Sequence, residues 1–389
     1  AIFVFTFGSI LCGLSSSLPQ FVAARVVQGI GGAMMVPVGR LVLLRTVPKS
    51  EIVRAMAWLT IPALIGPVLG PPLGGFITTY FHWRWIFWIN VPIGVLGLVL
   101  ASLYIENVRE KDVWPLDVTG FVLSGLGLSS LIFGLTIIGR GFAPPPVVAG
   151  LIVGGAALVA AYVWHAKRSP HPIIDLSLLK VPTFAASIYG GYLFRLGLGA
   201  IPFLLPLMLQ AGFGMNAFQS GAVTFIGALG SMLMKPTAAP ILKRLGFRRV
   251  LIGNAVLSSL FFGVLGFFGP QSSLTLMMAV LLVGGFFRSL QFTALNVIGY
   301  AEIDNQAMSR ATSFSSVTQQ LSLASGVAVG AGALEFMRVG HGGGALAASD
   351  FTPAFVVVAA LTALSFVTFL RLHPDAGAEM AGRKPSSEG

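Results

Sequence analysis

Three arginines lie inside long apolar runs of this chain, at Arg25, Arg195 and Arg288. A guanidinium keeps its charge in a protein, so inside a membrane it must face water or a polar partner. Two further polar residues follow Arg288 at spacings of three and eight and mark a polar face on one predicted helix. The predicted cavity-lining residues are therefore Arg195, Arg288, Gln291 and Asn296. The alternative is that the two arginines brace a helix bundle by binding backbone carbonyls.

The acidic residues are placed differently from the arginines. None of the 13 lies in the middle of a predicted span, because Asp117 and Glu335 lie at span ends and the others lie in loops or in the tail. The five histidines also lie in loops or at span ends. With buried arginines and no mid-span acid, a cavity in this protein should suit neutral or anionic amphiphiles better than dications.

The composition is that of a membrane protein. Hydrophobic residues make up 55% of the 389 residues and charged residues only 10%, whereas soluble domains carry about 25% charged residues. The net charge of +11 is not concentrated on a soluble domain, so no nucleic-acid partner is expected. The single cysteine, Cys12, excludes an intrachain disulfide, and neither a metal nor a cofactor is expected. We predict an all-α polytopic fold in the lipid bilayer, because a backbone that crosses a bilayer must satisfy its own hydrogen bonds.

Apolar runs predict twelve spans. Lys235 lies close to the end of one of them, and we expect its long side chain to extend to the membrane surface. The predicted spans are 1–14, 21–44, 57–81, 85–104, 116–138, 147–164, 183–210, 217–240, 249–268, 273–299, 311–335 and 352–371.

Basic residues in the loops predict the orientation. Seventeen Lys and Arg residues lie on one side of the membrane and three on the other. By the positive-inside rule, Ser15–Gln20 is outside and the tail from Arg371 is cytoplasmic. We therefore expect a multi-pass protein of the cell inner (cytoplasmic) membrane. Its polar tail, residues 374–389, is expected to be disordered, and the basic segment 243–249 is expected to be a cytoplasmic loop.

The predicted span 57–81 contains glycines and prolines in an unusual pattern. Glycines at every fourth position form a bare stripe that lets a neighbouring helix approach closely, and proline bends the helix. The pattern G-x3-G-P-x2-G-G, formed by Gly66, Gly70, Pro71, Gly74 and Gly75, resembles the antiporter motif of the fifth span in the major facilitator superfamily. The alternative is generic packing of small residues between membrane helices.

The predicted span 21–44 carries a second pattern. Its residues Arg25, Gln28, Gly29 and Gly31 follow Phe21 in an arrangement that resembles the fourth-span motif of the same superfamily. The resemblance implies a role in transport for these residues. The alternative for Arg25 is that its side chain extends to the outer surface of the membrane.

The order of these motifs refines the resemblance. They occupy the second and third predicted spans, whereas the superfamily has them in the fourth and fifth. The chain is therefore similar to the 14-span drug:proton antiporters (EmrB/QacA-type), and we expect it to be a fragment lacking the first two spans, with the proton-binding acid in the missing first span. The implied domains are an N-terminal bundle at 1–104, two linker spans and cytoplasmic linkers at 105–181, a six-helix bundle at 182–373 and a cytoplasmic tail at 374–389.

The resemblance implies a secondary transporter rather than an enzyme. It would export amphipathic small molecules by alternating access, with the proton gradient as its energy source, and the nucleotide-binding pattern G-x4-G-K-[ST] is absent from the sequence. Some relatives work with a periplasmic adaptor and an outer-membrane channel, which are therefore candidate partners. One alternative is an uptake or facilitated-diffusion carrier for an organic anion or a sugar. A polytopic membrane enzyme is disfavoured, because catalytic residue types do not cluster at one membrane face.

Overall fold

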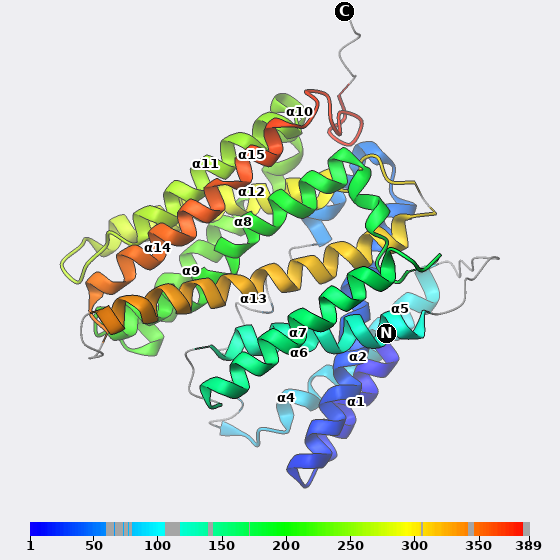
Figure 1. Cartoon of the computed structure of the whole chain (residues 1–389), viewed down its shortest axis with the longest axis horizontal. Coiled ribbons are helices and arrows are strands. Elements are labelled where there is room, and N and C mark those ends of the chain that lie inside the picture. The colour runs from blue at the N-terminus through cyan, green and yellow to red at the C-terminus, as the bar shows by residue number, and fades with distance from the viewer. Residues whose placement is uncertain are drawn as a thin grey trace, which may run out of the picture. The chain divides into compact units, whose positions relative to one another are not determined.

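A computed structural model of the chain shows helices joined by short turns (Figure 1). Among the residues that it describes, there is no strand. In the part of the chain that the structure describes, ten helical segments are long and apolar enough to cross a membrane, and Ile2–Leu14 is a shorter apolar helix. These findings confirm the predicted all-α polytopic fold. The described residues are 1–59, 66, 73, 77, 80–105, 117–138, 143–170, 172–304, 306–340 and 346–383.

The observed helices coincide with eleven of the twelve predicted spans, to within a few residues at each end. The remaining predicted span, 57–81, lies largely outside the described residues. The agreement has a simple cause, since the length of an apolar run sets the length of helix that a membrane can hold.

The helices fall into two compact units, and unit 1 consists of Ala1–Thr46 and Pro62–Trp114. In this unit α1 (Ile2–Leu14) packs against both α2 (Leu18–Thr46) and α5 (Asn90–Tyr104). Small residues permit this contact, because a Cβ atom at Gly8 would lie 2.5 Å from the backbone of Gln28, and one at Gly31 would collide with the backbone of Phe5. The helices of unit 1 are α1 (Ile2–Leu14), α2 (Leu18–Thr46), α4 (Trp85–Trp88) and α5 (Asn90–Tyr104).

Unit 2 consists of Val47–Ile61 and Pro115–Gly389. Its α-helices are α6 (Val118–Ile137), α7 (Pro145–Ala166), α8 (Pro182–Leu207), α9 (Ala217–Met234), α10 (Ala238–Leu245), α11 (Phe247–Leu265), α12 (Leu274–Ile298), α13 (Met308–Gly340), α14 (Ala348–Ala363) and α15 (Ser365–Leu370). Its shorter helices are η1 (Lys49–Glu51), η2 (Leu176–Lys180), η3 (Met208–Gly212) and η4 (Lys235–Thr237).

Helices α8 to α15 of unit 2 form a bundle (Figure 1). Residues of α8, η3, α9, α11, α12, α13 and α14 make up its apolar core. The main pairs are α8 with α13, α9 with α12, and α11 with both α12 and α14. Helices α6 and α7 pack against each other, and α6 also contacts α13. Core residues with less than 2% exposure include Leu204, Leu205, Met208, Leu265, Leu281, Phe351 and Phe355.

Local chemistry explains where several helices begin and bend. Asn216 and Gln219 form a reciprocal capping box at the start of α9. Pro202 and Pro206 lie inside α8, and the π-helix η3 follows directly after it. Since each proline lacks an N–H, the regular helical hydrogen-bond pattern cannot continue through this stretch.

The structure corrects two expectations, one about the basic segment 243–249 and one about the C-terminal tail. The segment 243–249 is not a loop: α10 ends at Leu245, α11 begins at Phe247, and Gly246 alone separates them with a φ of +77°. A glycine suits this position because other residues rarely adopt a positive φ. The tail was expected to be disordered, which is wrong for residues 374–383, where a series of turns buries Met380 and Ala381. The alanines and the methionine of the tail are buried, although its overall composition is polar and therefore predicted disorder.

The close contact between α8 and α13 gives a test of the fold. A Cβ atom at Gly326 of α13 would collide with the carbonyl oxygen of Leu196 on α8, whereas at Gly332 it would meet nothing within 4 Å. We expect Gly326→Ala to destabilise the protein by about 1–3 kcal/mol, the usual effect of overpacking, and Gly332→Ala to leave stability unchanged. Thermal unfolding of the two purified variants measures the difference, and equal melting temperatures would contradict the observed contact.

Candidate functional site

The predicted motif in α2 divides into a packed side and an exposed side. Gln28 is buried, accepts a hydrogen bond from Arg25 Nη1 and donates from Nε2 to Ser9 Oγ of α1 at 2.7 Å. The guanidinium of Arg25 is exposed and lies 5.8 Å from the ring centroid of Phe87. The motif residues therefore join a charged side chain to the α1–α2 contact.

Of the two glycines of that motif, one lies on the packed side of α2 and the other on the exposed side. Gly31 meets α1, where it leaves no room for a side chain, whereas a Cβ atom at Gly29 would meet nothing within 4 Å. Of the predicted antiporter motif, Gly66 is exposed and helical. The rest of that motif, Gly70, Pro71, Gly74 and Gly75, lies outside the described residues.

Arg195 lies at the centre of unit 2 and is fully buried, with 0% exposure. Its Nη2 donates to Asn296 Oδ1 at 3.1 Å, which joins α8 to α12, and its guanidinium lies 5.8 Å from the ring centroid of Phe292. Gly191, one turn earlier on α8, leaves the space that the guanidinium fills, because a Cβ atom there would lie 2.6 Å from Arg195 Nη1. A glycine, an amide and an aromatic ring thus surround one buried charge.

Gln291 lies on α12 toward α11, and Arg288 lies toward both α11 and α9, because a Cβ atom at Gly227 of α9 would be 3.1 Å from Arg288 Nη2. The guanidinium of Arg288 lies 5.5 Å from the ring centroid of Phe262, and Gln291 Nε2 donates to the carbonyl oxygen of Leu251 at 3.1 Å. Both side chains are buried, yet Arg288 Nη1 and Gln291 Oε1 have no hydrogen-bond partner. Sequence reasoning placed these two residues and Asn296 on one face of a helix, and the structure shows that they contact different neighbouring helices.

Lys235 is a third buried cation in unit 2, and the expectation that it extends to the membrane surface is wrong. Its exposure is 4%, and its Nζ donates to Thr293 Oγ1 on α12 at 3.1 Å. Nothing in the sequence indicates this partner, because a threonine in a span ordinarily bonds to its own helix. Helix α12 therefore supplies polar contacts to cations from both α8 and η4.

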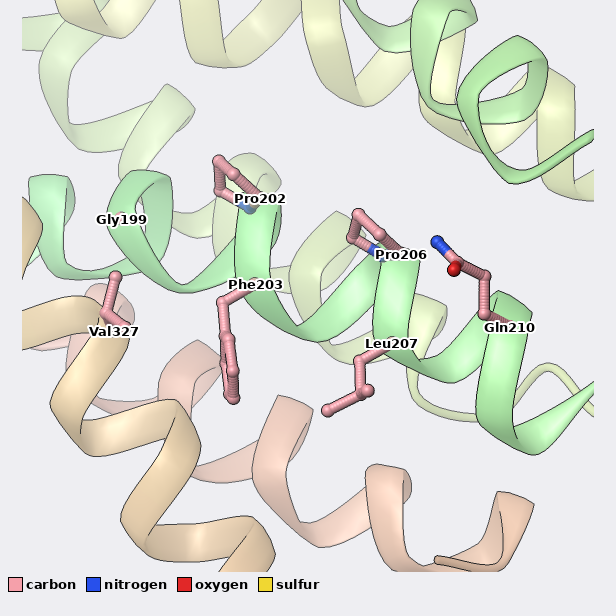
Figure 2. Close-up of a pocket in the computed structure, with 7 residues that line it drawn as sticks. All are labelled: Gly199, Pro202, Phe203, Pro206, Leu207, Gln210 and Val327. Atoms are coloured by element: carbon pink, nitrogen blue, oxygen red, sulfur yellow. The ribbon is translucent and has the colours of Figure 1, made fainter. Parts of the chain in front are cut away.

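A pocket of about 320 Å³ lies along the C-terminal half of α8. Figure 2 shows Pro202, Pro206 and Gln210 along one side of this segment, with Phe203 and Leu207 on the other. Gly199 of α8 and Val327 of α13 complete the lining, and Gln210 is the one polar side chain in it. Its Nε2 donates to Ser220 Oγ of α9 at 3.4 Å. The pocket can therefore hold an apolar group and offer it one amide.

The sequence relationships agree with this architecture. The model of the Major Facilitator Superfamily matches residues 1–327 and 188–388. The chain belongs to the major facilitator superfamily. It is 37% identical over 383 residues to the "Putative multidrug resistance protein MdtD" of Salmonella paratyphi A, and 36% identical to that of Salmonella typhimurium. Each match covers 96% of this chain and 80% of the relative. The protein is thus a multi-pass membrane transporter of this superfamily.

A solved structure shows the same fold. The proton:xylose symporter XylE, bound to 6-bromo-6-deoxy-D-glucose, aligns with a TM-score of 0.56 over 93% of this chain and 76% of its own. The sequence identity is 14%, so this likeness concerns the fold alone.

The Arg195–Asn296 contact predicts a clear difference between two variants. Asn296→Ala removes an acceptor from a buried guanidinium, and a hydrogen bond to a charged group contributes about 1.5–3 kcal/mol. We expect a melting temperature several degrees below that of the wild type. Asn296→Asp keeps an acceptor and adds an opposite charge, so it should retain the wild-type value. Equal losses in both variants would show that the amide acts through packing rather than through this bond.

Proposed function

We propose that this protein is a proton-coupled exporter of amphipathic small molecules that works by alternating access. The observation that carries the proposal is the relationship to the MdtD proteins, whose name describes multidrug resistance, over 96% of this chain. In this proposal the proton gradient supplies the energy, and the protein lies in the cell inner membrane with its C-terminal tail in the cytoplasm.

The pocket on α8 supports an amphipathic substrate. Its walls are proline, phenylalanine, leucine and valine, which bind apolar groups with little demand on their shape. A single amide, Gln210, can accept or donate one hydrogen bond. Binding of this kind tolerates many compounds, since few polar groups have to match.

The charges of unit 2 support neutral or anionic substrates over dications. Three cations, Arg195, Lys235 and Arg288, are buried within the bundle. Among the described residues, Asp350 in the first turn of α14 is the one buried acid. A dication that entered this bundle would meet a positive field in a medium of low dielectric constant. A periplasmic adaptor and an outer-membrane channel remain candidate partners by resemblance.

The second candidate is an uptake or facilitated-diffusion carrier for an organic anion or a sugar. The buried cations favour an anion in this case as well. The direction of flux separates the two candidates.

Transport by the full-length protein can be measured in inverted membrane vesicles with an acidic interior. We expect neutral and anionic amphiphiles to dissipate the pH gradient and dications to dissipate it less. Arg25→Ala removes the charged donor to Gln28, and a charge-assisted bond of about 1.5 kcal/mol predicts a roughly tenfold lower rate.

Arg338→Ala is the matched control for that measurement. Arg338 is an exposed arginine paired with Glu335 at the end of α13, so its loss should leave the rate unchanged. A pH gradient that no compound dissipates would overturn proton-coupled export and favour the carrier. Equal rates in Arg25→Ala and wild type would remove the motif in α2 from the mechanism.

The pocket makes a prediction about affinity. Gln210→Leu keeps the apolar walls and removes the amide, whose hydrogen bond contributes about 0.5–1.5 kcal/mol. The half-saturating concentration of a neutral amphiphile with a carbonyl or hydroxyl group should rise about 2- to 10-fold, while that of a purely aromatic compound should not change. Gln271→Leu, in the turn between α11 and α12, is the control. Equal shifts for both compound types would show that Gln210 does not contact the substrate.

A further inference from the structure

The interface between α11 and α12 contains buried polar atoms that lack hydrogen-bond partners. Four of them belong to Asn254 (Nδ2), Ser258 (Oγ), Arg288 (Nη1) and Gln291 (Oε1). The four residues are between 0% and 8% exposed. Proteins pair the great majority of such atoms with protein groups, ordered water or bound ligands, so four on one helix pair indicate that something small and polar occupies this interface.

Two contacts fix how these helices face each other. Gln291 Nε2 donates to the carbonyl oxygen of Leu251, and the guanidinium of Arg288 lies over the ring of Phe262. The contacts therefore pair the stretch of α11 from Leu251 to Phe262 with the turn of α12 that carries Arg288 and Gln291.

The unpaired residues of α11 lie between those two contacts. Asn254 and Ser258 follow Leu251 by three and seven residues, and Phe262 follows it by eleven. These spacings place all four on one face of a helix. The amide of Asn254 and the hydroxyl of Ser258 thus share one stretch of the interface with the unpaired atoms of α12.

The unpaired groups are mostly donors, and one of them is charged. An amide N–H, a hydroxyl and a guanidinium N–H can all donate to one acceptor. If the amide of Asn254 turned to donate to Gln291 Oε1, the hydroxyl of Ser258 and the guanidinium of Arg288 would still offer two donors. The chemistry of this set suits an anion.

The charge balance leads to the same conclusion. Among the described residues no carboxylate pairs with Arg288, and the one buried acid, Asp350, lies at the start of α14. An uncompensated charge inside a membrane-embedded bundle is costly, and a counter-ion removes much of that cost. The site lies between two packed helices, so a monatomic ion fits it better than an organic anion.

We propose that a halide ion of the size of chloride binds between α11 and α12, held by Arg288, Ser258 and Asn254. It is a resident counter-ion within the bundle and is separate from the pocket on α8. It neutralises Arg288 and connects the two helices.

The test uses the full-length protein in detergent, at equal ionic strength in sodium bromide, sodium chloride or sodium gluconate. A ligand that binds only the folded state raises the melting temperature by mass action. We expect a melting temperature a few degrees higher in either halide than in gluconate, with saturation as the halide concentration rises. Anomalous diffraction from crystals grown in bromide should place the ion beside Arg288.

Four variants make the test specific. Arg288→Gln should abolish the halide response, and Ser258→Ala, a milder change, should weaken halide affinity about 2- to 10-fold. Asn254→Asp supplies a carboxylate on the facing helix, so it should be as stable in gluconate as the wild type is in chloride, with no halide response. Arg338→Gln, at an exposed arginine, should keep the full response.

Three results would overturn the proposal. One is a wild-type melting temperature that is equal in halide and in gluconate, which would assign the interface to water. Another is an unchanged halide response in both Arg288→Gln and Ser258→Ala. The third is a bromide peak elsewhere in the molecule and none between α11 and α12.

Discussion

The cost of holding positive charge in an apolar bundle governs the architecture of unit 2. A guanidinium or ammonium group loses its hydration there and must recover that free energy from protein dipoles, aromatic faces or counter-ions. Arg195 recovers it from an amide and a ring, and Lys235 from a hydroxyl. All three of these groups belong to α12, which explains why a single helix carries several polar residues.

Close approach of backbones is what makes those short polar contacts reachable. At Gly199 and Gly326 a side chain would collide with the facing helix, and at Gly230 and Gly285 the same holds for α9 and α12. Where glycines bring helices together, dispersion contacts and dipoles act over short distances. The C-terminal half of α8 carries Pro202 and Pro206, and the pocket lies along it. Rigid packing and an open pocket thus occur on one helix.

The sequence predicted the helices well and their partners poorly, for physical reasons. A span is a local property, since about 20 apolar residues in a row suffice. Arg195 and Asn296 are 101 positions apart in the sequence. Their pairing depends on which faces of two helices meet, and the spacing of residues within one helix carries no information about that. Lys235 was misjudged for the same reason, because its partner lies on another helix. The one-residue break at Gly246 was missed because basic residues are typical of loops and of helix ends alike.

Arg195 and Arg288 share a sequence context but differ in their surroundings, and this difference bears on the choice between bracing a bundle and lining a cavity. Arg195 is enclosed by Gly191, Phe292 and Asn296, an arrangement that holds α8 and α12 together. Arg288 lies over the ring of Phe262, and among the described residues it has no polar partner comparable to Asn296. Arg195 is thus held by an amide of a facing helix, whereas Arg288 relies, in our proposal, on a bound ion. The same residue type can therefore join one helix pair through a side-chain contact and make the next one depend on an ion.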